Sequence, residues 1–203
     1  MNVYRVNEIF HSLQGEGINA GRAAIFIRLS GCNLKCPFCD TDFKSAEEMS
    51  VTEIKRVIIE SVGTNPMPSL CILTGGEPTL QLKADLIEAL HNMGMQVAME
   101  SNGTHEAPVG LDYITISPKS PFVKNGECKV TECTEVKVVM TETICDAEIC
   151  HFENIKAKYY YLQPCDTGDE KKNKVIMQRC VEFIKAHPNW VLSLQQQKIL
   201  NVR

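Results

Sequence analysis

Strand-like and helix-like segments alternate along most of this chain, and the alternation limits the folds that it can adopt. Residues 23–30, A-A-I-F-I-R-L-S, form an apolar run typical of a buried strand. Ser50 and Glu53 have the spacing of a capping box, which marks the start of a helix, and Gly63 marks its end. The apolar residues at helical spacing between them are Ile54, Val57, Ile58 and Val62.

The same alternation continues to the end of the chain. The further expected strands are residues 69–74, 95–100, 113–117, 135–139, 159–163 and 190–194. Two more helices are expected, one through Leu82, Leu86, Leu90 and Met93 up to Gly94, and one through Ile176, Cys180, Phe183 and Ile184. This order of elements indicates an α/β fold with a largely parallel sheet.

The length of the chain limits how far such a sheet can close. A complete eight-fold barrel has about 250 residues, whereas this chain has 203. We therefore expect a partial barrel or a curved open sheet. No repeat, low-complexity segment or linker divides the chain, so residues 1–203 are expected to form a single domain.

Polar or Gly/Pro turns follow four of the expected strands. They are T-G-G-E-P at 74–78, E-S-N-G-T at 100–104, S-P-K at 117–119 and Q-P at 163–164. Any one of them would indicate only a change in chain direction. Because parallel α/β folds place their sites at the carboxyl ends of strands, the four turns together predict one site built from several loops.

Charge and composition exclude several classes of protein. The formal net charge is -4, whereas a general nucleic-acid binder is usually basic. No apolar run is long enough to span a membrane, and the N-terminus lacks the apolar core of a signal peptide. We therefore expect a cytoplasmic protein without nucleic-acid or membrane partners. In that compartment, ten cysteines indicate metal binding or redox chemistry rather than a disulfide framework.

Three of these cysteines lie close together in one expected loop. Cys32, Cys36 and Cys39 form a C-x₃-C-x₂-C pattern beside Gly31 and Pro37. A structural zinc site takes four ligands, and ferredoxin-type runs carry four cysteines to close their cluster. Three thiolates suit a four-iron cluster whose fourth iron stays open to a substrate or cofactor. Buried free thiols are the alternative, but three in one short loop are unusual for that.

Two motifs resemble a known superfamily. C-N-L-K-C-P-F-C, at 32–39, is similar to the cluster loop of the radical S-adenosylmethionine (SAM) superfamily, and T-G-G-E-P resembles its SAM-binding turn. Nearly the whole chain resembles the 7-carboxy-7-deazaguanine synthase family within it. The segments that carry this resemblance are F-H-S-L-Q-G-E-G (10–17), A-I-F-I-R-L-S-G-C (24–32), C-D-T-D-F (39–43), E-S-N-G-T (100–104), S-P-K (117–119), Y-L-Q-P (161–164) and residues 190–203.

The resemblance implies a fold, a reaction and a set of partners. It implies a shortened, distorted partial (β/α) barrel of the radical SAM type. The implied enzyme is a lyase that converts 6-carboxy-5,6,7,8-tetrahydropterin to 7-carboxy-7-deazaguanine with loss of ammonia, on the route to queuosine. Its implied cofactors are a 4Fe-4S cluster, SAM and Mg²⁺. An electron donor such as flavodoxin and a homodimeric state are implied as well.

The resemblance also assigns roles to residues. Cys32, Cys36 and Cys39 would hold the cluster, and Thr41 would bind Mg²⁺. The implied substrate contacts are Leu13, Gln14, Gly15, Arg28 and Thr74, and the implied SAM contacts are Phe38, Cys39, Asp40, Gly76, Ser117, Pro118, Lys119 and Gln163. Glu16, Glu77 and Asn102 are secondary candidates.

Some residues allow more than one interpretation. From the residues alone, Asp40 or Asp42 is a more obvious Mg²⁺ ligand than Thr41. Arg28 can grip a substrate carboxylate bidentately, or it can form a surface ion pair. The family's usual L-Q-T-H-K reads L-Q-Q-Q-K here, with Gln197 at the histidine position. Glutamine does not titrate near neutral pH, so only a hydrogen-bonding role is carried over to it.

Most of the remaining cysteines are candidates either for the core or for a second metal site. Cys71 and Cys180 are expected in the core. An auxiliary site of four thiolates would use Cys128, Cys133, Cys145 and Cys150, although their spacing is wider than that of usual ligand pairs. Two other functions remain open, namely an activase that installs a glycyl radical on a partner protein, and a zinc-binding or redox-sensing module without enzymatic activity.

Overall fold

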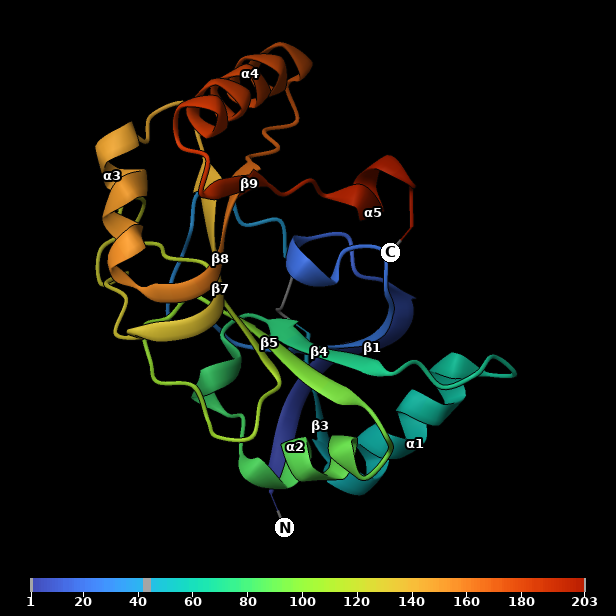
Figure 1. The fold of residues 1–203 in the computed structure, drawn as a ribbon. Helices are drawn as coiled ribbons and strands as arrows, with labels where there is room; N and C mark the ends of the chain where they lie inside the picture. Colours follow the sequence, from blue (N-terminus) through green and yellow to red (C-terminus); the bar gives the residue numbers. More distant parts are fainter. Residues whose placement is uncertain (1, 42–44, 203) are drawn as a thin grey trace.

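The computed structural model describes residues 2–41 and 45–202, which form one nine-stranded sheet with helices packed on it (Figure 1). The strands are β1 (Val3–Leu13), β2 (Ala23–Leu29), β3 (Glu47–Ser50), β4 (Leu70–Gly75), β5 (Gln96–Ser101), β6 (Tyr113–Ile116), β7 (Glu132–Met140), β8 (Lys156–Pro164) and β9 (Trp190–Leu192). The α-helices are α1 (Val51–Val62), α2 (Ala84–His91), α3 (Asp146–His151), α4 (Glu170–Ala186) and α5 (Gln196–Ile199). Short 3₁₀ helices are η1 (Gly17–Asn19), η2 (Pro78–Leu80) and η3 (Phe152–Asn154).

The sheet is mostly parallel and stays open. Its strand order is β3-β1-β2-β4-β5-β6-β7-β8-β9. Neighbours from β2 to β9 are parallel, whereas β1 is antiparallel to both β2 and β3. Since β3 and β9 are the two edges, the sheet does not close. The expected α/β fold with a partial barrel is confirmed.

The expected parallel strands and long helices are confirmed, with small changes of bounds. Helix α1 has the expected capping box, in which the Ser50 hydroxyl accepts from the Glu53 N–H and the Ser50 N–H donates to the Glu53 carboxylate. Helix α2 is shorter than expected, because Leu82 lies before it and Met93 after it. Both residues still pack on the core, which explains why they continue the apolar pattern.

Two strands and two α-helices were not expected from the sequence. Strand β1 mixes apolar and polar residues because it is only partly buried. Strand β3, E-E-M-S, is polar and exists because it pairs with β1. Helices α3 and α5 have six and four residues, which is too short for a periodic pattern to be recognised.

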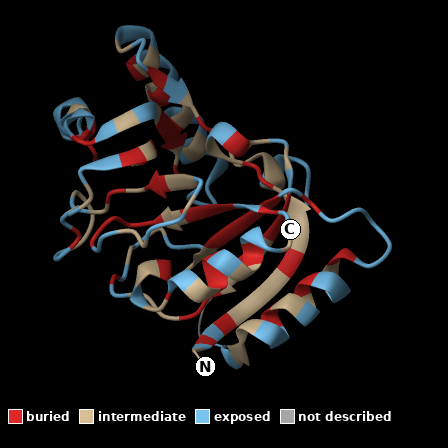
Figure 2. Cartoon of the chain, turned by 60° about the horizontal axis from the view of Figure 1, so that its bottom comes forward, coloured by how far each residue is buried: buried red, intermediate tan, exposed pale blue. Residues whose placement is uncertain are grey.

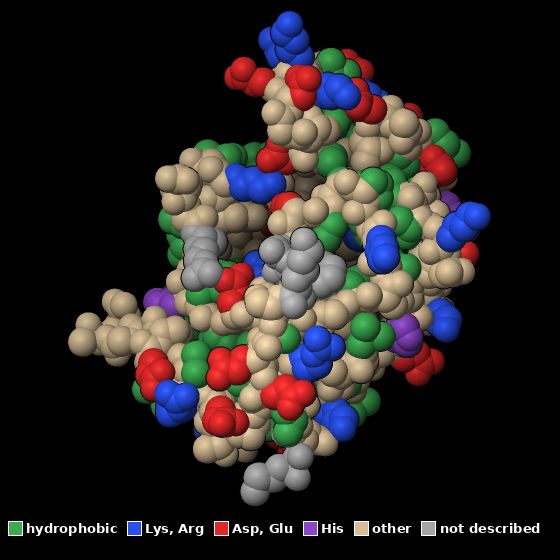
Figure 3. Space-filling model, turned by 180° about the vertical axis from the view of Figure 1, so that it is seen from behind, with side chains coloured by type: hydrophobic (Ala, Val, Ile, Leu, Met, Phe, Trp, Pro, Cys, Tyr) green, Lys and Arg blue, Asp and Glu red, His purple; other side chains and the backbone are tan. Residues whose placement is uncertain are grey.

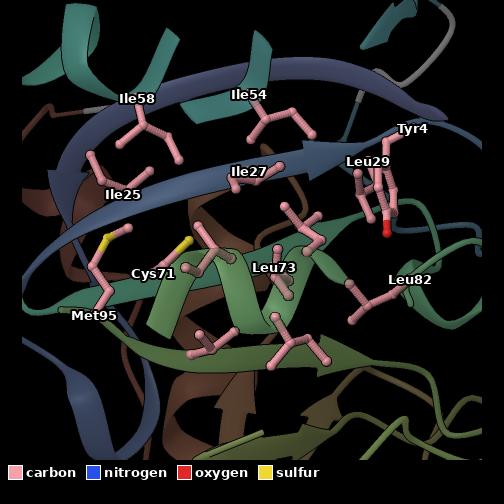
Figure 4. Close-up of a cluster of buried hydrophobic side chains, with 14 of the residues drawn as sticks. Tyr4, Ile25, Ile27, Leu29, Ile54, Ile58, Cys71, Leu73, Leu82 and Met95 are labelled. Carbon is pink, nitrogen blue, oxygen red and sulfur yellow. The ribbon is translucent and has the colours of Figure 1, made fainter. Parts of the chain in front are cut away.

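One face of the sheet is apolar and covered by helices. Alternate residues of a strand point to opposite faces, and one set from β1, β2, β4 and β5 packs with α1 and α2 into a core (Figure 4). A second core joins β6 to β9 with α3 and α4. Figure 2 shows the buried residues gathered along the strands and on the inner sides of the helices. Cys71 and Cys180 lie in these cores, as expected, and both are fully buried.

The other face of the sheet changes from apolar to polar along the strands. Toward the amino ends lies a small apolar cluster of Ala24, Leu70, Ile72 and Ala98. Further along the same strands and the same face come Arg28, four residues after Ala24, and Thr74 and Glu100, each two residues after the last member of the cluster on its strand. Arg28 lies opposite Thr74 in the ladder, and Glu100 lies opposite Thr115. The parity of the strands therefore places a polar surface at their carboxyl ends. No helix among the described residues is long and apolar enough to cross a membrane.

Candidate active site

A cavity of about 850 Å³ lies at the carboxyl ends of the strands. All four turns that the sequence singled out contribute to it, so they meet at one cavity, as expected. Figure 3 shows a face of the molecule that is hollowed near its centre, with acidic and basic side chains around the hollow. The residues named from the sequence that line the cavity are Leu13, Gln14, Gly15, Glu16, Arg28, Cys32, Cys36, Phe38, Cys39, Asp40, Thr41, Thr74, Gly76, Asn102, Ser117, Lys119 and Gln163.

Two of the expected site residues lie off the cavity wall. Pro118 is buried beside Ser117 and shapes the turn without lining the cavity. Glu77 is fully buried, and its carboxylate accepts from the Thr79 N–H (3.0 Å), the Ser101 hydroxyl (2.8 Å) and the Asn102 N–H (2.8 Å). Glu77 therefore joins the turn after β4 to the turn after β5. Asp42 and Arg203 lie outside the described residues.

The three clustered cysteines face the cavity from the loop after β2. Cys32 and Cys36 are half-buried and Cys39 is exposed. Burial raises the pKa of the Cys32 and Cys36 thiols, and the neighbouring thiols of the loop add to this effect. The Leu34 N–H donates to Cys32 Sγ over 3.4 Å. The cavity wall also includes Cys165, a buried residue after β8 that the sequence pattern did not single out.

The glycine turn after β4 runs directly against the cysteine loop. The Gly76 N–H donates to the Leu29 carbonyl (2.9 Å), and the Glu77 N–H donates to the Gly31 carbonyl (2.8 Å). A Cβ on Gly76 would lie 1.9 Å from the Gly31 carbonyl oxygen. A residue with a side chain does not fit there, so the close approach of the two loops requires glycine.

A lysine and a serine form the wall that β6 contributes. Lys119 Nζ donates to the Ser117 carbonyl (2.7 Å) and to the Ser117 hydroxyl. Burial lowers the pKa of Lys119 to about 8. Phe38, in the cysteine loop, packs edge-on against Phe122, with 4.8 Å between the ring centroids. Gln163 accepts from the Ser193 hydroxyl (3.0 Å).

Arg28 combines the two interpretations that the sequence left open. Its Nε donates to Glu8 Oε1 (2.8 Å), so it does form an ion pair. The pair is not on the open surface, however, because both side chains are about three-quarters buried and line the cavity. Arg28 Nη1 also lies 3.4 Å from the Thr41 hydroxyl. The guanidinium therefore lies inside the site, next to the residue implied to bind Mg²⁺.

A buried ionic network lies across the cavity, and no pattern in the sequence predicted it. Lys137 Nζ donates to Glu16 Oε2 and lies 3.9 Å from Glu100 Oε1. Glu100 also accepts from Gln14 Nε2 (2.9 Å) and from the Thr74 hydroxyl (3.3 Å). Two charged residues in the otherwise apolar strand E-V-K-V-V were the available signal. They indicate that one face of this strand is not core.

The groups of this network determine one another's charge state. Burial alone would raise the pKa of Glu16, but Lys137 and two amide donors lower it to about 2. Burial would lower the pKa of Lys137, but Glu100 and Glu16 raise it. Both groups are therefore charged at neutral pH. A buried ion pair is stable only with such additional hydrogen bonds.

The C-terminal segment forms one side of the cavity. Gln195 Nε2 and Gln197 Nε2 both donate to Glu16 Oε1, over 3.1 and 3.0 Å. Gln197 Oε1 is buried without a hydrogen-bond partner among the described residues, and it lies where a Cβ on Gly15 would be. Lys198 Nζ bridges Asp40 Oδ2 (3.2 Å) and Asp166 Oδ2 (3.0 Å). The segment thus joins three loops around the cavity.

The later cysteines do not assemble in the part of the chain that is described. Cys133 is buried on β7, Cys145 is exposed before α3, and Cys128 lies against Gly103. Among residues 2–41 and 45–202, no three His, Cys, Asp or Glu side chains gather closely enough to hold a single metal ion.

Comparisons with known proteins identify the family of this chain. The profile of the Radical SAM superfamily matches residues 26–132. The 7-carboxy-7-deazaguanine synthase of Bacteroides thetaiotaomicron is 42% identical over 98% of this chain and 98% of its own length. The synthase of Nitratidesulfovibrio vulgaris is 38% identical over 98% of this chain and 99% of its own length.

Solved structures resemble the fold as well. QueE from Escherichia coli superposes with a TM-score of 0.75 at 25% identity, over 95% of this chain and 93% of that chain. Streptococcus suis SuiB bound to its precursor peptide has a TM-score of 0.51 at 13% identity, over 79% of this chain and 46% of that one. The likeness to SuiB concerns the fold alone.

Proposed function

The chain belongs to the 7-carboxy-7-deazaguanine synthase family of the radical SAM superfamily, and from this premise we propose how its residues divide the work of the reaction. The enzyme is a radical SAM lyase that converts 6-carboxy-5,6,7,8-tetrahydropterin to 7-carboxy-7-deazaguanine with loss of ammonia, in 7-deazapurine biosynthesis. The observation that carries the proposal is one cavity that joins a three-cysteine loop, a glycine turn and a wall of paired charges.

The residues present fit the implied cofactors. Cys32, Cys36 and Cys39 offer three thiols from one loop to the cavity, which suits a 4Fe-4S cluster with one open iron. Gly76 lines the cavity beside this loop, and its backbone is proposed to contact SAM. When bound, the cluster and SAM would supply the radical chemistry that starts the reaction. The residues proposed to orient SAM are Ser117, Lys119, Gln163, Phe38 and Asp40.

The charged wall is proposed to bind the pterin. Arg28, positioned by Glu8, can donate hydrogen bonds from its guanidinium to the substrate carboxylate. Gln14 and Thr74 both donate to Glu100, so all three are fixed before the substrate enters. Such preorganised donors and acceptors position a substrate without reorganisation cost. Leu13 and Gly15 complete this side of the cavity.

Further properties of the enzyme are proposed on the family likeness. Thr41, whose hydroxyl faces the cavity beside Arg28, is the proposed protein ligand of Mg²⁺, an ion that keeps several water or substrate oxygens. We also propose a homodimer that acts in the cytoplasm as a single domain per chain and takes its electron from a donor such as flavodoxin.

Anaerobic turnover tests the proposed function. The reconstituted protein is supplied with 6-carboxy-5,6,7,8-tetrahydropterin, SAM, Mg²⁺ and a chemical reductant, and the products are separated by chromatography. Formation of 7-carboxy-7-deazaguanine and ammonia without any second protein is the expected result. Cleavage of SAM that yields no deazapurine would contradict the proposal and favour an activase with a protein substrate.

A further inference from the structure

Glu135 is a buried carboxylate that lies behind the cavity wall. It is 4% exposed and belongs to the middle of β7. One oxygen, Oε1, accepts from the Thr115 hydroxyl over 2.7 Å. The other, Oε2, accepts from the Ile18 backbone N–H over 2.9 Å. Glu135 thus connects the floor of the sheet to the turn that follows Gln14.

The turn rests directly on this carboxylate. Gly17 has a φ of 63°, and a Cβ there would lie 2.3 Å from Glu135 Oε1. On the other side of Glu16, a Cβ on Gly15 would lie 1.7 Å from Gln197 Oε1. The backbone is therefore fixed on both sides of Glu16. Glu16 itself lines the cavity, whereas Glu135 does not.

A buried carboxylate is energetically unfavourable as a purely structural support. Burial of a charged group is unfavourable unless it is paired and hydrogen-bonded, and an apolar replacement of a buried ion pair is often neutral or stabilising. Lys137, two residues along the same face of β7, compensates the charge of Glu135 only in part, because it also pairs with Glu16 and approaches Glu100. The benefit must therefore lie in the geometry that Glu135 imposes.

We propose that Glu135 is a positioning residue of the reaction, which holds the turn of residues 15–18 so that Gln14 and Glu16 meet the substrate in a fixed orientation. The inference rests on the proposed function, because it concerns the same substrate. It adds a residue that touches neither substrate nor cofactor. Its effect is expected on the substrate side of the cavity and not on the SAM side.

Steady-state kinetics of two variants test this role. Glu135→Ala removes the acceptor of the Ile18 N–H, and the KM for the pterin should rise about tenfold or more. Glu135→Gln keeps an amide oxygen for that N–H, and its KM should stay within about threefold of the wild type. The affinity for SAM should be unchanged in both. Glu132→Gln is the matched control, because Glu132 lies on the same strand in an exposed ion pair with Lys156.

Hydrogen–deuterium exchange gives a readout that does not depend on turnover. Faster exchange confined to residues 14–19 is expected in Glu135→Ala and not in Glu135→Gln. If Glu135→Ala does not fold, Thr115→Val replaces it, because valine keeps the shape of threonine and removes the hydroxyl that holds Glu135. A smaller increase in the KM for the pterin than in Glu135→Ala is then expected.

The outcomes separate the inference from the proposed function. A folded Glu135→Ala variant with the wild-type KM, or one that loses SAM affinity as much as pterin affinity, overturns the inference alone. A wild type that binds SAM but leaves the pterin unconverted overturns the proposed function, and the inference with it.

Discussion

At the scale of single residues, the closest approaches between loops of the site occur at glycines, which have no Cβ. Gly76 lies against the Gly31 carbonyl and Gly15 against the Gln197 side chain, so both loops approach to a distance that only glycine allows. The resemblance to the radical SAM superfamily implies that the T-G-G-E-P turn binds SAM. The structure adds a second reason for its glycines, which is the packing of this turn on the cysteine loop.

Substitution of Gly76 tests that packing. Gly76→Ala places a Cβ 1.9 Å from backbone of the cysteine loop, and overpacking of this kind costs about 1–3 kcal/mol. We expect the affinity of the reconstituted enzyme for SAM, measured by equilibrium dialysis, to fall about tenfold or more. Gly94→Ala is the control, because Gly94 has a φ of 83° with nothing within 4 Å of a Cβ. It should lower stability by about 1–2 kcal/mol and leave SAM affinity unchanged. An equal loss of affinity in both variants would refute the contact.

The ionised state of Glu16 makes stability depend on pH. Its pKa in the folded protein is about 2, compared with the ordinary value of 4.5. Because the folded pKa is the lower one, the stability that ionised Glu16 contributes is complete above about pH 4.5 and is lost as the pH falls toward 2. Glu100, Glu135 and Lys137 face the same network, and all three are present in the wild type and in the Glu16→Gln variant used to test this.

Urea unfolding of the wild type and of Glu16→Gln measures this contribution. The free energy of unfolding of the wild type, minus that of the variant, should be constant between pH 7 and about pH 5. It should then decrease at each step down to about pH 3. A difference that does not change with pH would mean that Glu16 has the same pKa in the folded and unfolded chain.

At the scale of elements, the C-terminal segment is the part of the site that sequence periodicity could not predict. Helix α5 has four residues, and its position follows from side-chain bonds to Glu16, Asp40 and Asp166. In contrast, α1, β2 and the strands β4 to β9 follow from local patterns, because their helical spacing or apolar runs can be recognised in the sequence. Lys137 and Glu135 show the limit of that reading, since their partners come from distant loops.

Substitution of adjacent glutamines tests the role of this segment. Gln197→Ala removes one of the two amide donors to Glu16, and we expect the KM for the pterin to rise about three- to tenfold. Gln196→Ala is the matched control, because Gln196 does not line the cavity. It should behave as the wild type in the same kinetic assay. Identical kinetics for the two variants would show that the bond from Gln197 to Glu16 does not affect the substrate.

At the scale of the whole molecule, the fold and the chemistry are carried by different residues. The two helix-covered cores contain none of the three clustered cysteines, whereas the cavity on the opposite face contains all of them. The sequence predicted both halves, the cores from apolar periodicity and the site from the turns. It could not predict the ionic network between Glu16, Lys137 and Glu100, which depends on the register of β5 and β7 with the loop before β2.

Removal of the thiols tests this separation. A variant with Ala at positions 32, 36 and 39 should keep the circular dichroism spectrum of the apo wild type and melt within a few degrees of it, because no core contact is lost. It should take up no iron on reconstitution. Loss of the folded spectrum would show that the cysteine loop is needed for the fold itself.

Electron paramagnetic resonance of the reduced, reconstituted wild type tests most directly whether the cavity holds a cluster that binds SAM. About four irons per chain and a cluster signal that changes when SAM is added are the predicted result. A protein that takes up zinc in place of iron, or a cluster whose signal is the same with and without SAM, would contradict the assignment of the site.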